Sequence, residues 1–203
     1  MKEIEILSSL KENIPSAESK IQNFVFSGGE TFEFKGEYNI IDTYFVSDVF
    51  NDFNPDENGR LRACLRLRQK DKDNVYLTHK QDIFDEKDTW LYSDEVEAKI
   101  QDRENFLLIL KSLHFKELTT IRNVRRFYEA KNYEIVLEDI ADLGLFVEVE
   151  YKSTNDIAEG EVPAVQQKVR NLILDLALVV GEELNVGKPE LVLKKLQTKN
   201  LGL

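Results

Sequence analysis

Residues 60–70 alternate basic and aliphatic side chains more regularly than any other part of the chain. Up to residue 68, one parity holds four arginines and a cysteine and the other holds leucine and alanine: Arg60, Arg62, Cys64, Arg66 and Arg68 against Leu61, Ala63, Leu65 and Leu67. Side chains two residues apart in a β-strand lie on the same face, so this pattern predicts a strand with one charged and one apolar face. A polar turn at 71–74 and a second strand at 75–81 complete a predicted β-hairpin. The chain must therefore build a sheet that buries the apolar face and accommodates the charged one.

The same period of two recurs along the chain, with a sign of charge that differs from strand to strand. The acidic pairs are Glu3/Glu5, Glu95/Glu97 and Glu148/Glu150, the basic pair is Arg66/Arg68, and Lys80 adds a cation on the other strand of the hairpin. One interpretation is an antiparallel sheet whose charged face is exposed to solvent. The other is a sheet that curls until its charged face turns inward. The second is favoured because helices rich in leucine, isoleucine and valine need an apolar outer face to cover.

A charged interior is costly unless its groups are paired, so an incompletely balanced one invites a ligand. Arginine and lysine bind phosphate oxygens, and clustered carboxylates hold Mg²⁺ or Mn²⁺. The pattern therefore points to a polyanion that carries a divalent metal.

Further elements follow from periodicity and from turn residues. Strands are predicted at 1–8, 31–47 (one or two strands), 89–100, 119–130, 133–140 and 145–151, and helices at 9–24, 102–113, 163–183 and 190–197. The regular part of the first helix is expected to begin at Pro15. No repeat or shift in composition marks a boundary, so we expect one α+β domain built on an antiparallel sheet of seven or eight strands.

The charge and the cysteine content of the 203-residue chain restrict its expected compartment and its expected partners. Its 27 basic and 38 acidic residues give a net charge of −11, and the resulting field repels nucleic acid. The longest apolar run, residues 172–180, is too short for a membrane helix and is broken by Asp175. The lone Cys64 excludes an intramolecular disulfide and a cysteine zinc site. We expect a cytoplasmic protein without nucleic-acid or membrane partners.

Seven short motifs, in order along the chain, resemble the CYTH-domain family, the triphosphate tunnel metalloenzymes. They are E-x-E at 3–5, D-x-Y at 42–44, L-R-x-R at 65–68, L-T-x-K at 77–80, E-x-E at 95–97, R-x-x-Y at 125–128 and L-G-x-F-x-E-x-E at 143–150. The resemblance covers roughly residues 1–195 and implies a single CYTH-like domain over residues 1–203. It also implies the family fold, a closed antiparallel eight-stranded β-barrel whose interior is the triphosphate tunnel, with helices packed outside.

The resemblance also implies roles for individual residues. The metal carboxylates would be Glu3, Glu5, Glu148 and Glu150, with Glu138 or Asp139 as a further acid, and the metal would be Mg²⁺ or Mn²⁺. The residues that bind phosphate oxygens would be Arg66, Arg68, Lys80, Arg125 and, in the C-terminal segment, Lys188. Glu97, with Glu95, would balance these cations or orient a nucleophile. Leu7 stands where the family carries a signature lysine, and Asn123 stands where some members carry a second one.

Three functions remain open at this point. The leading one is metal-dependent hydrolysis of a nucleoside, thiamine or inorganic triphosphate. The second is a class IV adenylyl cyclase, which would convert ATP to cyclic AMP and pyrophosphate in the same tunnel. The third is a non-catalytic binder of phosphorylated ligands or polyphosphate, because Leu7 removes a cation from the acidic strand. The expected partner is a triphosphate-containing small molecule or polyphosphate, with a homodimer open as an alternative to a monomer.

The histidines and the cysteine have ordinary structural interpretations. His79 has the parity opposite to Lys80, which predicts an outer structural position, and His114 is expected at the negative end of a helix. No histidine shares the predicted face of Cys64, so this residue is interpreted as a small strand residue and not as a nucleophile.

Overall fold

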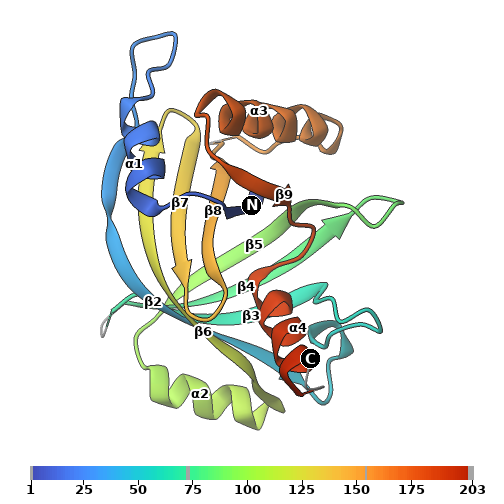
Figure 1. The fold of residues 1–203 in the computed structure, drawn as a ribbon. Coiled ribbons are helices and arrows are strands. Elements are labelled where there is room, and N and C mark those ends of the chain that lie inside the picture. The colour runs from blue at the N-terminus through green and yellow to red at the C-terminus, as the bar shows by residue number, and fades with distance from the viewer. Residues whose placement is uncertain (1, 72–73, 154, 201–203) are drawn as a thin grey trace. The chain divides into compact units, whose positions relative to one another are not determined.

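Nine β-strands form one hydrogen-bonded sheet in the computed structural model, which describes residues 2–71, 74–153 and 155–200 (Figure 1). The strands are β1 (Lys2–Leu10), β2 (Glu33–Ser47), β3 (Ala63–Gln69), β4 (Val75–Phe84), β5 (Trp90–Ile100), β6 (Phe115–Ala130), β7 (Tyr133–Ile140), β8 (Gly144–Tyr151) and β9 (Val180–Glu183). Their order is β5-β4-β3-β2-β6-β7-β8-β1-β9, and β5 also pairs with β1.

Four α-helices accompany the sheet in the described part of the chain: α1 (Ile14–Asn23), α2 (Arg103–Ser112), α3 (Val162–Asp175) and α4 (Lys188–Asn200). Two short 3₁₀ helices, η1 (Asn51–Phe53) and η2 (Glu159–Glu161), lie in the connections. The predicted α+β class with an antiparallel sheet is confirmed. None of the described helices has the length and apolar character needed to cross a membrane.

The chain divides into two units, each assembled from three segments. The first unit comprises Met1–Tyr38, Phe84–Tyr92 and Asn123–Asn185, and the second comprises Asn39–Ile83, Ser93–Arg122 and Val186–Leu203.

The core of the first unit lies between its strands and the helices α1 and α3. The Asn13 side chain caps α1 by accepting the Ser16 N–H at 2.9 Å, and Pro15 occupies the first turn, as predicted. Ala17 and Ile21 of α1 are fully buried, and α3 contacts β1 and β8 (Figure 1). The buried residues include Ile6, Leu10, Tyr128, Ile135, Leu137, Val147, Val149, Val169 and Leu172. The even-numbered, aliphatic side of β1 therefore faces this core.

The core of the second unit lies between α2 and the apolar side of β3. The Asp102 carboxylate caps α2 by accepting the Asn105 N–H at 3.0 Å. Leu110 of α2 is buried in one cluster with Leu65 and Leu67, and Phe106 and Leu107 pack against it. This contact confirms the prediction that a helix covers the apolar face of the segment 60–70.

The predicted helix at 163–183 is wrong in its second half. The helix α3 ends at Asp175, Ala177 takes a left-handed conformation with φ 53°, and Val180–Glu183 forms the strand β9. β9 pairs with β1 at Ser8 and Leu10, which is why β1 runs two residues beyond its predicted end. The apolar residues at 176 and 180 keep helical spacing, so the sequence pattern does not reveal the turn. The C-terminal end of β1, at Ser8 and Leu10, supplies the partner, and the sheet gains a ninth strand that the sequence analysis missed.

Candidate functional site

The three predicted phosphate-binding side chains of the hairpin lie on one face of the second unit. Arg66 stands opposite Thr78, and Cys64 stands opposite Lys80, in the β3–β4 register. Directly paired residues point to the same side, so Arg66, Arg68 and Lys80 share a face, as the parity predicted. We call these three residues the basic set. His79 stands opposite Leu65 on the other face and contacts the Phe53 ring with centroids 5.7 Å apart, which confirms its structural position.

Arg68 is held by a buried carboxylate. Its Nε and Nη2 atoms donate to the two carboxylate oxygens of Asp42 at 2.8 and 2.9 Å. Asp42 is 1% exposed and lies directly opposite Arg68 in the β2–β3 register. A bidentate pair of this kind fixes the plane of the guanidinium group. Asp42 belongs to the D-x-Y motif, and its role as the anchor of Arg68 was not predicted.

Arg66 joins both predicted catalytic glutamates in one network. Its Nη2 atom donates to the Thr78 hydroxyl at 3.1 Å, and that hydroxyl donates to Glu97 Oε2 at 3.1 Å. Arg66 Nη2 also lies 3.7 Å from Glu95 Oε1. The structure therefore brings Glu95 directly to Arg66 and links Glu97 to it through Thr78, a residue that the sequence analysis did not assign to the site.

One donor of Arg66 remains available within this network. The Arg66 side chain is 12% exposed, and its Nε–H is buried without a hydrogen-bond partner among the described residues. Burial lowers the pKa of Arg66, but Asp42 and the other acidic groups around it outweigh this effect and raise the pKa above its ordinary value. Arg66 is therefore a permanent, half-buried cation whose buried Nε–H is unsatisfied, which is a feature that an anionic ligand can complete.

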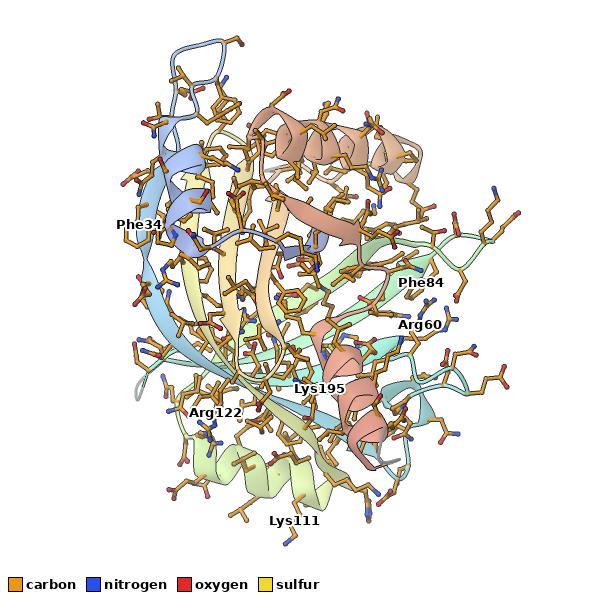
Figure 2. All side chains as sticks on the ribbon, viewed as in Figure 1. Phe34, Arg60, Phe84, Lys111, Arg122 and Lys195 are labelled. Carbon is orange, nitrogen blue, oxygen red and sulfur yellow. The ribbon has the colours of Figure 1, made fainter. Side chains whose placement is uncertain are left out.

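The first turn of α4 brings a further carboxylate, Glu190, to the segment that leads into β3 in the second unit. Lys188 and Glu190 are 9% and 8% exposed, and Glu190 Oε1 accepts the Leu61 N–H at 3.1 Å. Burial raises the pKa of Glu190 to about 7, with Asp82 adding to the rise. The cation of Arg60, labelled in Figure 2, partly offsets this shift. Glu190 was not predicted, although it lies two residues after Lys188 in the same helical turn.

Cys64 is unsuited to nucleophilic chemistry. Burial raises the pKa of its thiol to about 12, and the nearby cations of Arg66 and Lys80 only reduce that rise. The side chain therefore stays a neutral thiol at physiological pH, in agreement with its interpretation as a small strand residue.

The predicted metal carboxylates belong to the first unit and share one face of its strands. Glu5 stands opposite Glu150, and Leu7 stands opposite Glu148, in the β1–β8 register. Glu3 has the parity of Glu5 on the same strand. The position where the resemblance places a signature lysine is therefore a leucine that is 2% exposed, opposite Glu148 and on the same strand face as Glu5.

The structure distinguishes Glu138 from Asp139 as the acid on this face. Glu138 is fully buried and stands opposite Arg125 on β6 and Phe146 on β8, whereas Asp139 is exposed and has the opposite parity. Arg125, which is 3% exposed, forms ion pairs with Glu138 and with Glu148, the latter at 2.9 Å. Glu138 and Glu148 therefore neutralise Arg125 in this structure.

Lys152 and Glu134 extend the acidic face and were missed by the sequence analysis. The Lys152 ammonium lies 3.1 Å from Glu150 and 3.3 Å from Glu134. Burial raises the pKa of Glu150, and the Glu3 carboxylate raises it further, while Lys152 opposes the rise. Glu148, Glu150 and Lys152 continue the period of two, so extending that pattern past the end of β8 would have found the lysine.

Three predicted metal carboxylates besides Glu138 and Glu148 lie on this face, Glu3, Glu5 and Glu150, and we call them the acidic set. The Glu3 carboxylate raises the pKa of Glu150, Glu5 stands opposite Glu150, and a divalent cation would relieve the repulsion between these acids. Carboxylate oxygens are ligands that Mg²⁺ and Mn²⁺ accept, so the chemistry of this set fits the implied metal. As the described side chains lie, no three acidic, histidine or cysteine residues are grouped tightly enough to hold an ion.

The fold and the site define a class of protein: α+β proteins whose antiparallel strands alternate charged with apolar side chains, the charges being acidic on some strands and basic on others. Within that class, this chain belongs to the CYTH family, since the CYTH domain model matches residues 1–176.

Comparison with individual proteins agrees with this assignment. The chain is 31% identical over 158 residues to a Methanocaldococcus jannaschii protein described as a "putative adenylate cyclase", covering 77% of this chain and 82% of that one. A solved protein of Pyrococcus horikoshii superimposes with a TM-score of 0.71 at 24% identity, over 95% of this chain and 99% of that one. A "putative adenylate cyclase" from Vibrio parahaemolyticus superimposes with a TM-score of 0.72 at 13% identity, over 95% and 98%. At these identities the two structures establish the fold alone.

Proposed function

We propose that this protein is a metal-dependent enzyme that hydrolyses a nucleoside, thiamine or inorganic triphosphate. The observation that carries the proposal is the buried Nε–H of the half-buried Arg66, which has no hydrogen-bond partner within the described residues. Burying a cation with an unsatisfied donor is costly unless a ligand completes its contacts. A phosphate oxygen is the ligand that arginine binds best, because it accepts charge-assisted hydrogen bonds.

The basic set supports recognition of more than one phosphate group. Asp42 holds Arg68 in a fixed orientation, Thr78 and Glu95 hold Arg66, and Lys80 shares their face. Cations that are positioned before binding lose little side-chain freedom when the ligand arrives. Such a row suits an extended polyphosphate chain better than a single phosphate ion.

The CYTH family supports a closed arrangement of the sheet around the ligand. We propose that the chain is one CYTH-like domain and that the β5–β1 pairing closes the sheet as an eight-stranded barrel, with the charged face forming the triphosphate tunnel. The acidic set would hold Mg²⁺ or Mn²⁺ in that tunnel, and Arg125 would be kept in place by Glu138 and Glu148. The ion would neutralise phosphate charge and thereby lower the barrier to attack on phosphorus.

The chain's own residues account for the remaining chemistry. Arg66 and Arg68 would orient the phosphate chain and stabilise the charge that accumulates on it. Glu97, held by the Thr78 hydroxyl, would accept a hydrogen bond from the attacking water and orient it. Glu95 would balance the Arg66 charge when the site is empty of substrate.

Adenylyl cyclase activity is the second candidate, and the description of the M. jannaschii relative favours it. The same phosphate-binding residues would then position ATP so that its 3′-hydroxyl attacks the α-phosphorus. A non-catalytic binder is the third, because Leu7 leaves the acidic strand without the family lysine.

An assay of purified protein with ATP or tripolyphosphate, in Mg²⁺ or Mn²⁺, separates these functions. Release of inorganic phosphate supports hydrolysis, and formation of cyclic AMP with pyrophosphate supports the cyclase. Thermal stabilisation by ligand without either product supports a binder. The absence of both turnover and stabilisation would refute all three.

A matched pair of variants tests the role of Arg66. Arg66→Ala should weaken tripolyphosphate binding by about tenfold or more, because it removes a buried charged donor. Arg122→Ala removes an exposed arginine of β6, labelled in Figure 2, and should leave the affinity unchanged. Equal effects of the two substitutions in a calorimetric titration would show that the buried guanidinium is not the phosphate-binding group.

A further inference from the structure

The first unit contains a cavity of about 450 Å³ that the predicted site residues do not line. It lies between the segment after α1, the turn joining β6 to β7, the end of β8 and the helix α3. Tyr133 and Tyr151 stand opposite each other in the β7–β8 register, and Glu134 and Glu150 form the next pair. Adjacent pairs point to opposite sides, so this cavity is on the face of the sheet away from the acidic set. Its volume falls within the roughly 300–1,000 Å³ usual for small-molecule sites.

Four half-buried aromatic rings form one wall of the cavity. The Tyr133 and Tyr151 rings are nearly perpendicular, with centroids 5.3 Å apart, and the Phe26 ring is within 12° of parallel to Tyr133 at 6.2 Å. Phe24 meets Phe26 edge to face at 4.9 Å. These rings line the cavity in both stacked and edge-to-face arrangements, and a planar aromatic ligand packs favourably in either.

The charged side chains that line the cavity favour a ligand with one small anionic group. Lys131 stands 4.9 Å from the Phe26 centroid but is already paired with Glu30 at 3.0 Å. Lys168 stands 5.8 Å from the Tyr151 centroid, and its ammonium group has no ion-pair partner within residues 2–71, 74–153 and 155–200. Asp175, seven residues further along α3, lines the same cavity and opposes a large negative charge. The available charge therefore matches a single anionic group and not a triphosphate.

We propose that this cavity is a second ligand site, which binds a planar aromatic ring carrying one small anionic group. The ring packs against Tyr133 and Phe26, and the anion, a monophosphate or a carboxylate, binds Lys168 beside the amide of Asn171. Asn171 lies three residues after Lys168 on α3, so the two side chains share one face of the helix. The site is distinct from the residues proposed to bind triphosphate and does not depend on their function.

Two matched pairs of probes test the proposal and separate the two anions. Binding of AMP and adenosine, and of indole-3-acetate and indole, is measured by ligand-observed NMR titration. At least one charged probe should bind about fivefold more tightly than its neutral partner, because it gains the Lys168 contact at a partly exposed site. Inorganic phosphate, which lacks a ring, should not bind. If neither charged probe binds better than its neutral partner, the proposal is wrong.

Variants and competition locate the binding. Lys168→Gln should weaken the charged probe about fivefold and leave its neutral partner unaffected, whereas Lys35→Gln, at a lysine outside the cavity, should change neither. Tyr133→Leu should weaken both members of the pair by about tenfold through lost ring packing. Tripolyphosphate should not displace the probe. Displacement by tripolyphosphate, or unchanged binding in Lys168→Gln, would place the probe elsewhere and overturn the proposal.

Discussion

Leu7 lies directly opposite Glu148 in the β1–β8 ladder, with only 2% of its surface exposed. On the same strand, Ile6 points to the other side, into the apolar core of the first unit. Two neighbouring buried positions therefore meet opposite environments: carboxylates at Leu7 and aliphatic side chains at Ile6. This contrast leads to a prediction about lysine at each of them.

Leu7→Lys should be tolerated far better than Ile6→Lys. A lysine at position 7 faces Glu148 and lies beside Glu5, so its charge is paired, and the unfolding free energy should fall by less than about 2 kcal/mol. A lysine at position 6 has no carboxylate in its cluster and should cost more than about 4 kcal/mol. Urea denaturation of the two variants measures the difference. Equal losses would mean that the face of Leu7 is not an acidic environment.

Arg125→Met should destabilise the protein by about 3 kcal/mol or more, because it leaves the fully buried Glu138 without its cation. Adding Glu138→Gln to the same chain should restore at least about 1 kcal/mol, since the uncompensated buried charge is then removed. Chemical denaturation of the two single variants and the double variant gives the coupling energy. A double variant that loses the sum of the two single effects would show that the ion pair contributes no coupling.

Thr78→Val should loosen Arg66 without creating a cavity. The Thr78 hydroxyl is buried, accepts from Arg66 and donates to Glu97, so the isosteric substitution breaks two hydrogen bonds. We expect a loss of about 1–2 kcal/mol in unfolding free energy and about fivefold weaker tripolyphosphate binding.

Thr43→Val is the matched control for this effect. It also removes a buried threonine hydroxyl, which contacts Thr120 at 3.1 Å, but it leaves the Arg66 network intact. Calorimetric titration should therefore show parental affinity for tripolyphosphate. If the control weakens binding as much as Thr78→Val does, the effect is not specific to Arg66.

Glu190 should make the stability of the protein fall as the pH rises towards neutrality. Burial raises the folded-state pKa of Glu190 from 4.5 to about 7, so the folded state favours the protonated carboxyl group. The free-energy penalty for ionising Glu190 is absent below its ordinary pKa of 4.5. It grows between 4.5 and about 7, and it is complete above about 7. The pKa shift corresponds to about 3 kcal/mol at most.

Glu190→Gln removes this penalty and can keep the hydrogen bond from the Leu61 N–H. Relative to the parent, the variant should gain about 2 kcal/mol of unfolding free energy between about pH 5 and about pH 8. Glu182→Gln, at an exposed glutamate, should follow the parent across the same range. Parallel stability curves for Glu190→Gln and the parent would show that Glu190 is ionised at no unusual cost.

The accuracy with which the sequence predicted a strand depended on whether its side chains alternate strictly between polar and apolar. Strands with strict alternation were found to within a few residues, because the period of two reports directly on which face is buried. The strand β9 was mistaken for helix, since four residues are too few to show a period and their spacing continued that of α3. A strand of this kind forms because the end of β1 pairs with it, and no local pattern encodes that pairing.

The candidate site shows the same division. The parity of Arg66, Arg68 and Lys80, and of Glu5, Glu148 and Glu150, followed from sequence and agrees with the observed registers. The hydrogen-bond and ion-pair partners of these residues did not follow from sequence. Thr78 and Asp42 reach the arginines from neighbouring strands, and Lys152 reaches Glu150 from beyond the predicted end of its strand. Glu190 reaches its site from a helix more than a hundred residues further along the chain than Leu61.

The sequence by itself determined which side chains share a face of each strand, since that depends only on the alternation built into an extended backbone. It also determined the family to which the chain belongs, through seven short motifs in order. The tertiary structure decided which charges are paired with one another and which donors are left for a ligand. Those outcomes depend on how strands distant in sequence come into register, and register is set by packing and hydrogen bonding of the whole sheet and not by any one segment.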